Sequence, residues 1–129
     1  MHTTPRFVVA VSLLSLACIM HTSSSQDGSA VFDWSVHGTA RPSQCYETGA
    51  AYFSVTLYDE RSRALGTYDA RCDAFATTVP LLPGRYTADA VLTDSSRGPR
   101  TTTILVSSFD IYGGESVTIA VDFPPDSFY

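Results

Sequence analysis

The chain has 129 residues and a formal net charge of −5, and all of its basic residues are arginine. An acidic chain repels the phosphate backbone, so we expect nucleic acid not to be a partner. The sequence contains no asparagine, the acceptor of N-linked sugars, and this excludes N-glycosylation.

The first 20 residues have the organisation of a secretory signal sequence. A short polar start with Arg6 precedes an uncharged apolar run from Phe7 to Met20. This run is too short for a comfortable membrane span, which needs roughly 20 residues, and it fits the apolar region of a signal sequence. We therefore expect the protein to be exported from the cytoplasm.

The apolar run contains Ser15-Leu16-Ala17-Cys18, which resembles the lipobox of bacterial lipoproteins. The resemblance implies that Cys18 becomes a lipidated N-terminus, although Ser15 stands where the family prefers leucine. In the alternative, Cys18 is discarded and a soluble protein is cut within residues 21–29. That segment is rich in serine and glycine and predicts a flexible tether, because such residues cannot bury enough surface to fold.

The cysteines predict one disulfide. The chain has three of them, and removal or lipidation of Cys18 leaves Cys45 and Cys72 as a pair. An exported protein meets an oxidising compartment in which disulfides persist. We expect this bond to join loops at one end of the folded domain.

Apolar and polar residues alternate along the rest of the chain, and this period of two predicts strands, with helices essentially absent. Strands are expected at residues 31–39, 51–59, 65–70, 75–81, 86–93, 101–112 and 117–123. In the sixth, the apolar face changes parity, which predicts a β-bulge near Ser107 and Ser108. The pattern predicts an all-β domain over residues 30–129, a seven-stranded antiparallel β-sandwich of immunoglobulin-like or transthyretin-like type.

Two of these strands have clearly separated faces. The core-facing residues are expected to be Phe32, Trp34 and Val36 in the first strand and Phe53, Val55 and Leu57 in the second. The outward residues of the second strand are Tyr52, Ser54, Thr56 and Tyr58. Tyrosine beside small hydroxyl residues is typical of adaptable binding surfaces, although tyrosine and threonine are also good strand formers. These four outward residues are the candidate binding site.

A family resemblance covers most of residues 31–123. It is carried by an ordered set of features: Trp34, His37-Gly38, Cys45, Gly49-Ala50, Cys72, Leu82-Pro83-Gly84-Arg85-Tyr86, Leu92-Thr93-Asp94 and Val121-Asp122-Phe123. This order resembles small uncharacterised envelope lipoprotein domains of myxobacteria and their relatives. The Leu-x-Pro-Gly-x-Tyr element also resembles transthyretin-like, carboxypeptidase-regulatory-like sandwiches. The resemblance implies a fold and an envelope location, and it transfers no active site.

Residues for catalysis or metal binding are sparse. His37 would have to serve any catalytic triad, and it is expected on the outer face of the first strand. Zinc needs clustered cysteine and histidine ligands. Asp59-Glu60, Asp69 and Asp73 could lie near one end of the sandwich, but they lack the spacing of a calcium loop. We therefore expect no catalytic residue, no metal and no cofactor.

Three functions remain as hypotheses. The first is a non-enzymatic envelope module, lipid-anchored or secreted, that contacts another protein or a glycan. The second is a small-ligand carrier or binding subunit of transthyretin-like type, which a pocket between the sheets would favour. The third is a secreted hydrolase, which acids clustered with a histidine in a cleft would favour.

Overall fold

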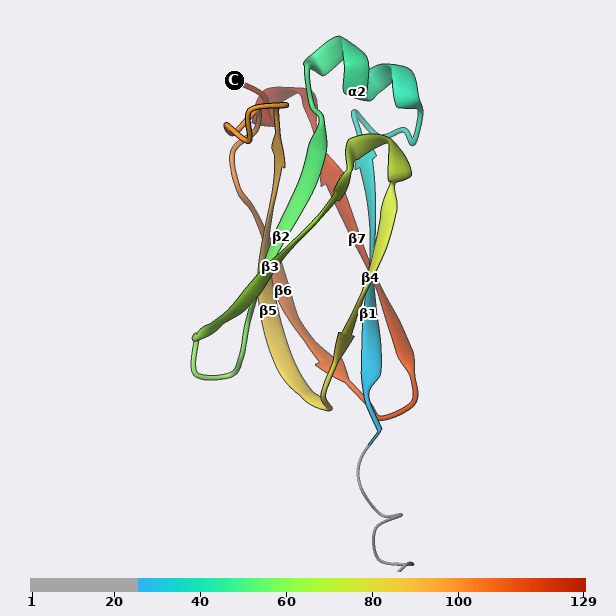
Figure 1. Ribbon diagram of the computed structural model, residues 1–129, viewed down its shortest axis with the longest axis vertical. Coiled ribbons are helices and arrows are strands. Elements are labelled where there is room, and N and C mark those ends of the chain that lie inside the picture. The colour runs from blue at the N-terminus through green and yellow to red at the C-terminus, as the bar shows by residue number, and fades with distance from the viewer. Residues whose placement is uncertain (1–25) are drawn as a thin grey trace, which may run out of the picture.

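The alternating segments form seven strands in two sheets in the computed structural model, which describes residues 26–129 (Figure 1). The strands are β1 (Gly28–Val36), β2 (Tyr52–Tyr58), β3 (Ala64–Arg71), β4 (Ala76–Leu81), β5 (Gly84–Thr93), β6 (Ile104–Ile111) and β7 (Ser116–Phe123). The predicted all-β fold with seven strands is confirmed. The predicted signal sequence, Cys18 and the first part of the tether lie outside the described residues. Within residues 26–129, no helix is both long enough and apolar enough to cross a membrane.

The strands form a three-stranded sheet in the order β4-β1-β7 and a four-stranded sheet in the order β3-β2-β5-β6. Neighbouring strands are antiparallel except for β1 and β7, which run parallel with Phe32 opposite Ile119. The prediction of a purely antiparallel sandwich is therefore wrong at this pair. Parallel neighbours need a long crossover connection, and here the rest of the domain supplies it.

The sixth strand contains the predicted bulge. Tyr86 pairs with Phe109 and Ala88 pairs with Val106, so Ser107 and Ser108 together oppose the single residue between Tyr86 and Ala88. Two residues against one are the definition of a bulge. The bulge explains how both halves of β6 keep their apolar residues toward the other sheet.

Aromatic side chains fill the space between the sheets. The predicted core faces of β1 and β2 are buried, and Trp34 is only 2% exposed. Its ring stacks on Phe53 with centroids 3.9 Å apart, and its Nε1 donates to the Cys72 carbonyl at 2.9 Å. Stacked aromatic rings contribute beyond the area that they bury. The Trp34–Phe53 pair therefore joins the two sheets directly.

A short helix, α2 (Pro42–Thr48), follows β1, and the expectation that helices are absent is wrong here. Pro42 begins the helix with its fixed φ, and Gly49 ends it with a φ of 76°. Only Cys45 of the helix is buried, so the segment has no apolar periodicity. Two 3-10 turns complete the fold: η1 (Cys72–Ala74) and η2 (Pro125–Ser127).

The first strand starts earlier than the sequence suggested. Gly28 and Ser29, expected in the tether, pair with Leu81 and Pro80 of β4. Gly28 is buried, and a side chain there would meet the Tyr112 carbonyl oxygen at 2.3 Å. Small residues without alternation carry no strand signal, which explains the shift of this boundary.

Candidate functional site

The disulfide fixes one end of the domain. Cys45 in α2 and Cys72 at the start of η1 are bonded, with their Cα atoms 6.0 Å apart. Both residues are buried, and α2 and η1 lie side by side at the same end of the two sheets (Figure 1). The predicted Cys45–Cys72 disulfide at one end of the domain is confirmed.

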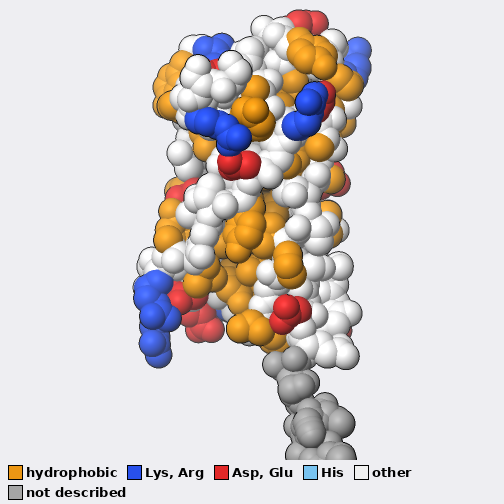
Figure 2. Space-filling view, in the orientation of Figure 1, with side chains coloured by type: hydrophobic (Ala, Val, Ile, Leu, Met, Phe, Trp, Pro, Cys, Tyr) orange, Lys and Arg blue, Asp and Glu red, His pale blue; other side chains and the backbone are white. Residues whose placement is uncertain are grey.

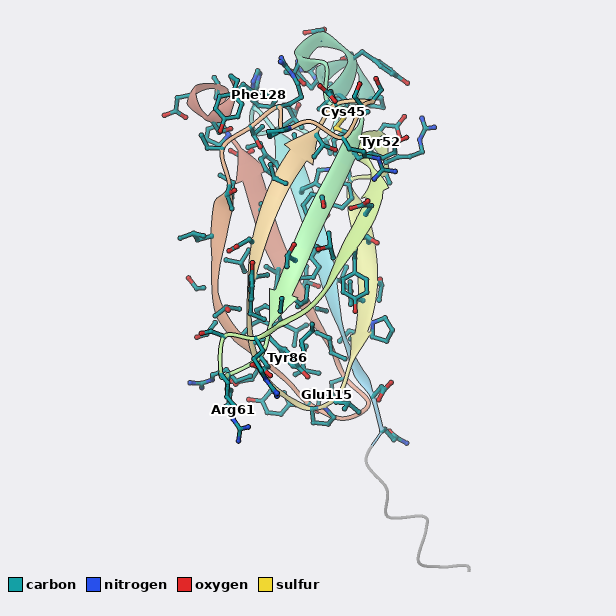
Figure 3. The ribbon with its side chains drawn as sticks, turned by 60° about the vertical axis from the view of Figure 1, so that its left-hand side comes forward. Cys45, Tyr52, Arg61, Tyr86, Glu115 and Phe128 are labelled. Carbon is teal, nitrogen blue, oxygen red and sulfur yellow. A yellow bond between two sulfur atoms is a disulfide. The ribbon has the colours of Figure 1, made fainter. Side chains whose placement is uncertain are left out.

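A pocket of about 420 Å³ opens beside this disulfide. Its lining includes both cysteines, Tyr46 from α2, Tyr52 from the start of β2, and Asp73 from η1. Figure 3 shows Cys45 and Tyr52 together at this end, with Arg61 and Tyr86 at the other. The pocket thus combines apolar atoms with aromatic and charged side chains.

A fixed ion pair borders the pocket. Arg71 donates twice to Asp73, from Nε to Oδ1 at 3.0 Å and from Nη2 to Oδ2 at 2.9 Å. Hydrogen bonding by the guanidinium lowers the pKa of the Asp73 carboxyl, and the carboxylate in turn raises the pKa of Arg71. The Tyr46 hydroxyl lies 3.4 Å from Asp73 Oδ2 and donates to it. Basic and acidic side chains stand next to one another at this end in Figure 2, and bidentate pairs of this kind hold their geometry well.

Arg97, in the loop that follows β5, packs against Tyr52. The guanidinium of Arg97 lies 3.8 Å from the centre of the Tyr52 ring, and the same guanidinium forms an ion pair with Asp69 of β3. A cation over a tyrosine face is attracted by the negative potential of the ring. Thr93 lies opposite Tyr52 in β5, and its buried hydroxyl has no hydrogen-bond partner in the described part of the chain.

The four predicted binding residues of β2 face outward, as the alternation of residues along the strand predicted. Tyr52, Ser54, Thr56 and Tyr58 are all half-buried on the outer face of the four-stranded sheet. Thr56 shares a hydrogen bond with Thr67 at 2.9 Å, and the Tyr58 hydroxyl donates to Asp89 at 3.0 Å. That bond raises the pKa of Tyr58. Of the four residues only Tyr52 lines the pocket, because Tyr58 stands at the opposite end of β2.

Tyr46 and Asp73 line the pocket and were not among the predicted site residues. No role was predicted for Tyr46, and Asp73 was considered only as a possible calcium ligand. Each directly follows a cysteine of the disulfide, so the predicted bond itself brings the two side chains together. This adjacency was the signal in the sequence that could have identified them.

The remaining candidates for chemistry are dispersed. His37 is exposed just after β1, where its ring meets the edge of Phe128 with centroids 5.2 Å apart. Asp59 lines a different pocket with Gly84, at the opposite end of β2 from Asp73, so the expectation that these acids share one end is wrong. Among residues 26–129, no group of three histidine, cysteine or acidic side chains is placed to hold a metal ion.

Comparisons with known proteins give little resemblance. No protein-family model matches the chain, and no curated protein matches it. A leucine-rich repeat protein from Bacteroides thetaiotaomicron is similar in structure, with 16% sequence identity and a TM-score of 0.44. The match covers 79% of this chain and 14% of that protein. A likeness at this level assigns neither a family nor a function.

Proposed function

We propose that the protein is a non-enzymatic, exported module of the bacterial cell envelope that binds another protein or a glycan through the pocket at its disulfide end. The observation that carries the proposal is the placement of Tyr46 and Tyr52 around one pocket beside the fixed Arg71–Asp73 pair. Tyrosine offers a large apolar face and a hydroxyl with few rotamers to freeze on binding. Protein surfaces and sugars present this same mixture of apolar faces and hydroxyl or amide groups.

The fold type that we propose is transthyretin-like and carboxypeptidase-regulatory-like, as the sequence features suggest. In the immunoglobulin order, the first strand lies beside the second, and the third lies beside the sixth. In this chain β1 lies between β4 and β7, and β2 lies between β3 and β5. The strand order therefore favours the transthyretin-like alternative, while the origin among myxobacterial-type lipoproteins rests on the sequence resemblance.

The carrier and hydrolase hypotheses receive less support. A carrier of transthyretin-like type would need space for its ligand deep between the sheets, and the centre of the domain is filled by Phe32, Trp34 and Phe53, which are fully or almost fully buried. The space that does lie between the two sheets is a groove at their edge, between β6 and β7. A hydrolase would need an acid bonded to the His37 ring, but that ring packs against Phe128, and the nearby Asp122 accepts instead from Ser35 and from the Gly38 N–H. The pocket at the disulfide end, with Tyr46 and Tyr52 in its lining, favours a binding module.

Attachment through a lipid on Cys18 is part of the proposal. β1 begins at the end of the domain opposite α2 (Figure 1). Its nine residues rise about 3.3 Å each, so the pocket lies on the order of 30 Å from the start of the strand. An anchor that precedes β1 would therefore attach to the domain at the end opposite the pocket. Wild-type protein should therefore incorporate labelled fatty acid and Cys18→Ser should not, whereas an unlabelled wild type with an N-terminus beyond Ser25 would contradict the anchor.

Binding through the pocket is tested with a matched pair of tyrosine substitutions. Tyr46 is 70% exposed beside the pocket, and Tyr112 is 56% exposed after β6 at the opposite end. Immobilised wild type, Tyr46→Ser and Tyr112→Ser are compared as baits for envelope extract and on a glycan array. We expect Tyr46→Ser to lose the partner with an unchanged melting temperature and Tyr112→Ser to retain it. Equal capture by all three would contradict the pocket as the binding site.

A further inference from the structure

Within residues 26–129, three of the four edge strands carry features that block the addition of another strand. β4 contains the exposed Pro80, which has no N–H to donate. β3 carries the exposed Asp69 and Arg71 and an irregular register opposite β2. β6 contains the bulge at residues 107–108. Proline, charge and bulges are the recognised ways in which proteins protect sheet edges from pairing with other chains.

β7 carries no proline and no bulge, and its one charged residue, the exposed Asp122, lies near its C-terminal end. Its residues Ser116 to Val121 are uncharged, contain no proline, and are rich in the β-branched types that favour strands. All eight of its residues pair with β1 in an uninterrupted register, and within the described residues β7 has no other strand neighbour. Its second edge therefore presents a regular row of backbone donors and acceptors.

An apolar groove lies next to this edge. A pocket of about 390 Å³ separates β6 from β7, and half-buried apolar side chains line it from both strands. Ile104, Val106 and Phe109 come from β6, and Val117 and Ile119 come from β7. Apolar side chains also reach the surface on the face that Figure 2 shows. The groove beside β7 differs from that surface because it adjoins a strand edge to which a further strand can pair. The added strand would cover the apolar side chains of the groove.

We propose that the strand added to β7 is β7 of a second copy of this chain, in antiparallel pairing centred on Ile119. This register places Val117 opposite Val121 of the other copy, on the face that looks into the groove. It places Thr118 opposite Ala120 and Ser116 opposite Asp122 on the outer face. Apolar residues then meet apolar residues, and no two like charges stand opposite each other. β7 is thus complementary to itself, as a two-fold interface requires.

The pairing has consequences for strength and orientation. One pair of strands forms an interface at the small end of the specific range, about 1,200 Å² or less, so we expect a dimer that depends on concentration. Antiparallel pairing also puts the Gly28 residues of the two copies at opposite ends of the dimer. It therefore joins released copies or copies on facing surfaces, and it does not depend on the function proposed above for the pocket.

The test introduces charge on the exposed face of β7. In the proposed register, Thr118→Lys with Ala120→Lys opposes lysine to lysine twice across the two-fold axis. Sedimentation equilibrium of the exported protein, kept in detergent where it is lipidated, should show wild-type dimers. The lysine variant should dissociate with an affinity at least about tenfold weaker. Mixing it with Thr118→Glu, Ala120→Glu should restore a dimer that contains one copy of each.

The matched control lies on the other edge of the same sheet. Ala76 and Thr78 of β4 have the same residue types as Ala120 and Thr118 and are likewise exposed. Ala76→Lys with Thr78→Lys should leave the wild-type dimer intact. Wild type that remains monomeric up to millimolar concentration would overturn the proposal. So would a β7 lysine variant that dimerises as well as the β4 control, or a lysine and glutamate mixture that stays monomeric.

Discussion

At the scale of single residues, Tyr86 couples packing to a hydrogen bond near the end where β1 begins. Its hydroxyl donates to the Leu82 carbonyl at 2.6 Å, and its ring stacks against Phe109 with centroids 6.1 Å apart. The residue is 8% exposed, and burial raises the pKa of its hydroxyl. Because the pKa of this hydroxyl is higher in the folded than in the unfolded protein, its protonated form stabilises the fold below about pH 10. This contribution is lost as the pH rises through the folded-state pKa.

We expect Tyr86→Phe to lower the free energy of unfolding by about 1 kcal/mol near neutral pH, because the Leu82 carbonyl loses its donor. The same change should reduce the loss of stability that the wild type suffers at alkaline pH, because the buried hydroxyl that must ionise is gone. Urea unfolding near neutral pH and above about pH 10 measures both effects. Tyr68→Phe on the exposed part of β3 serves as the control and should change neither value. A steeper alkaline loss in Tyr86→Phe would contradict the assignment.

The sequence predicted residue positions well where a strict rule applied. Period-two alternation put Tyr52 on the outer face and Phe53 in the core. Cys45 and Cys72 were paired because they are the two cysteines that remain when Cys18 is removed or lipidated. The contact between Tyr52 and Arg97 was out of reach, because Arg97 comes from a distant loop and has a φ of 69°. No local pattern indicates where such a side chain points.

At the scale of elements, Gly28 shows where the first strand begins. A Cβ there would lie 2.3 Å from the Tyr112 carbonyl oxygen and 2.9 Å from that of Glu115, and both are backbone atoms. Gly28→Ala should therefore lower the free energy of unfolding by about 1–3 kcal/mol, the usual cost of overpacking. Gly98→Ala, whose Cβ would approach Asp94 no closer than 3.4 Å, is the control and should cost much less. Equal stability of the two variants in denaturant titration would place residue 28 in the tether.

The elements that sequence reasoning missed have physical explanations. α2 spans seven residues with a single buried one, so it lacks the apolar stripe from which helices are recognised. Pro42 and Gly49 mark its two ends, in the positions where proline begins and glycine ends a helix. The parallel pairing of β1 with β7 joins segments from the two ends of the domain, and neither strand carries a local sign of its partner.

At the scale of the whole molecule, the two ends of the domain are stabilised differently. Between the ends, the sheets share the stacked Trp34–Phe53 pair and the aromatic core around it. At the pocket end, α2 is held by the disulfide and by Arg100, which donates to the Thr48 carbonyl at 2.8 Å and 3.0 Å. The pocket therefore depends on a covalent bond more than on the core.

Removal of the disulfide should consequently affect both stability and the pocket. The bond closes a loop between residues 27 positions apart, so Cys45→Ala with Cys72→Ala should cost about 3–4 kcal/mol on the chain-entropy model. That is a large share of the 5–15 kcal/mol typical of small domains, yet the core should still fold. Denaturant unfolding of the oxidised, reduced and double-alanine proteins measures the cost, and the last two should agree.

Hydrogen exchange on the same three proteins separates the two ends of the domain. Amide protection should fall first in α2 and η1, because each loses its covalent link to the other, while the amides of β2 and β5 at the centre of the larger sheet should exchange only on global unfolding. An unchanged unfolding midpoint without the bond would show that the core alone determines stability. Uniform loss of protection across the sheets would show instead that the disulfide is required for the whole fold and not for the pocket end.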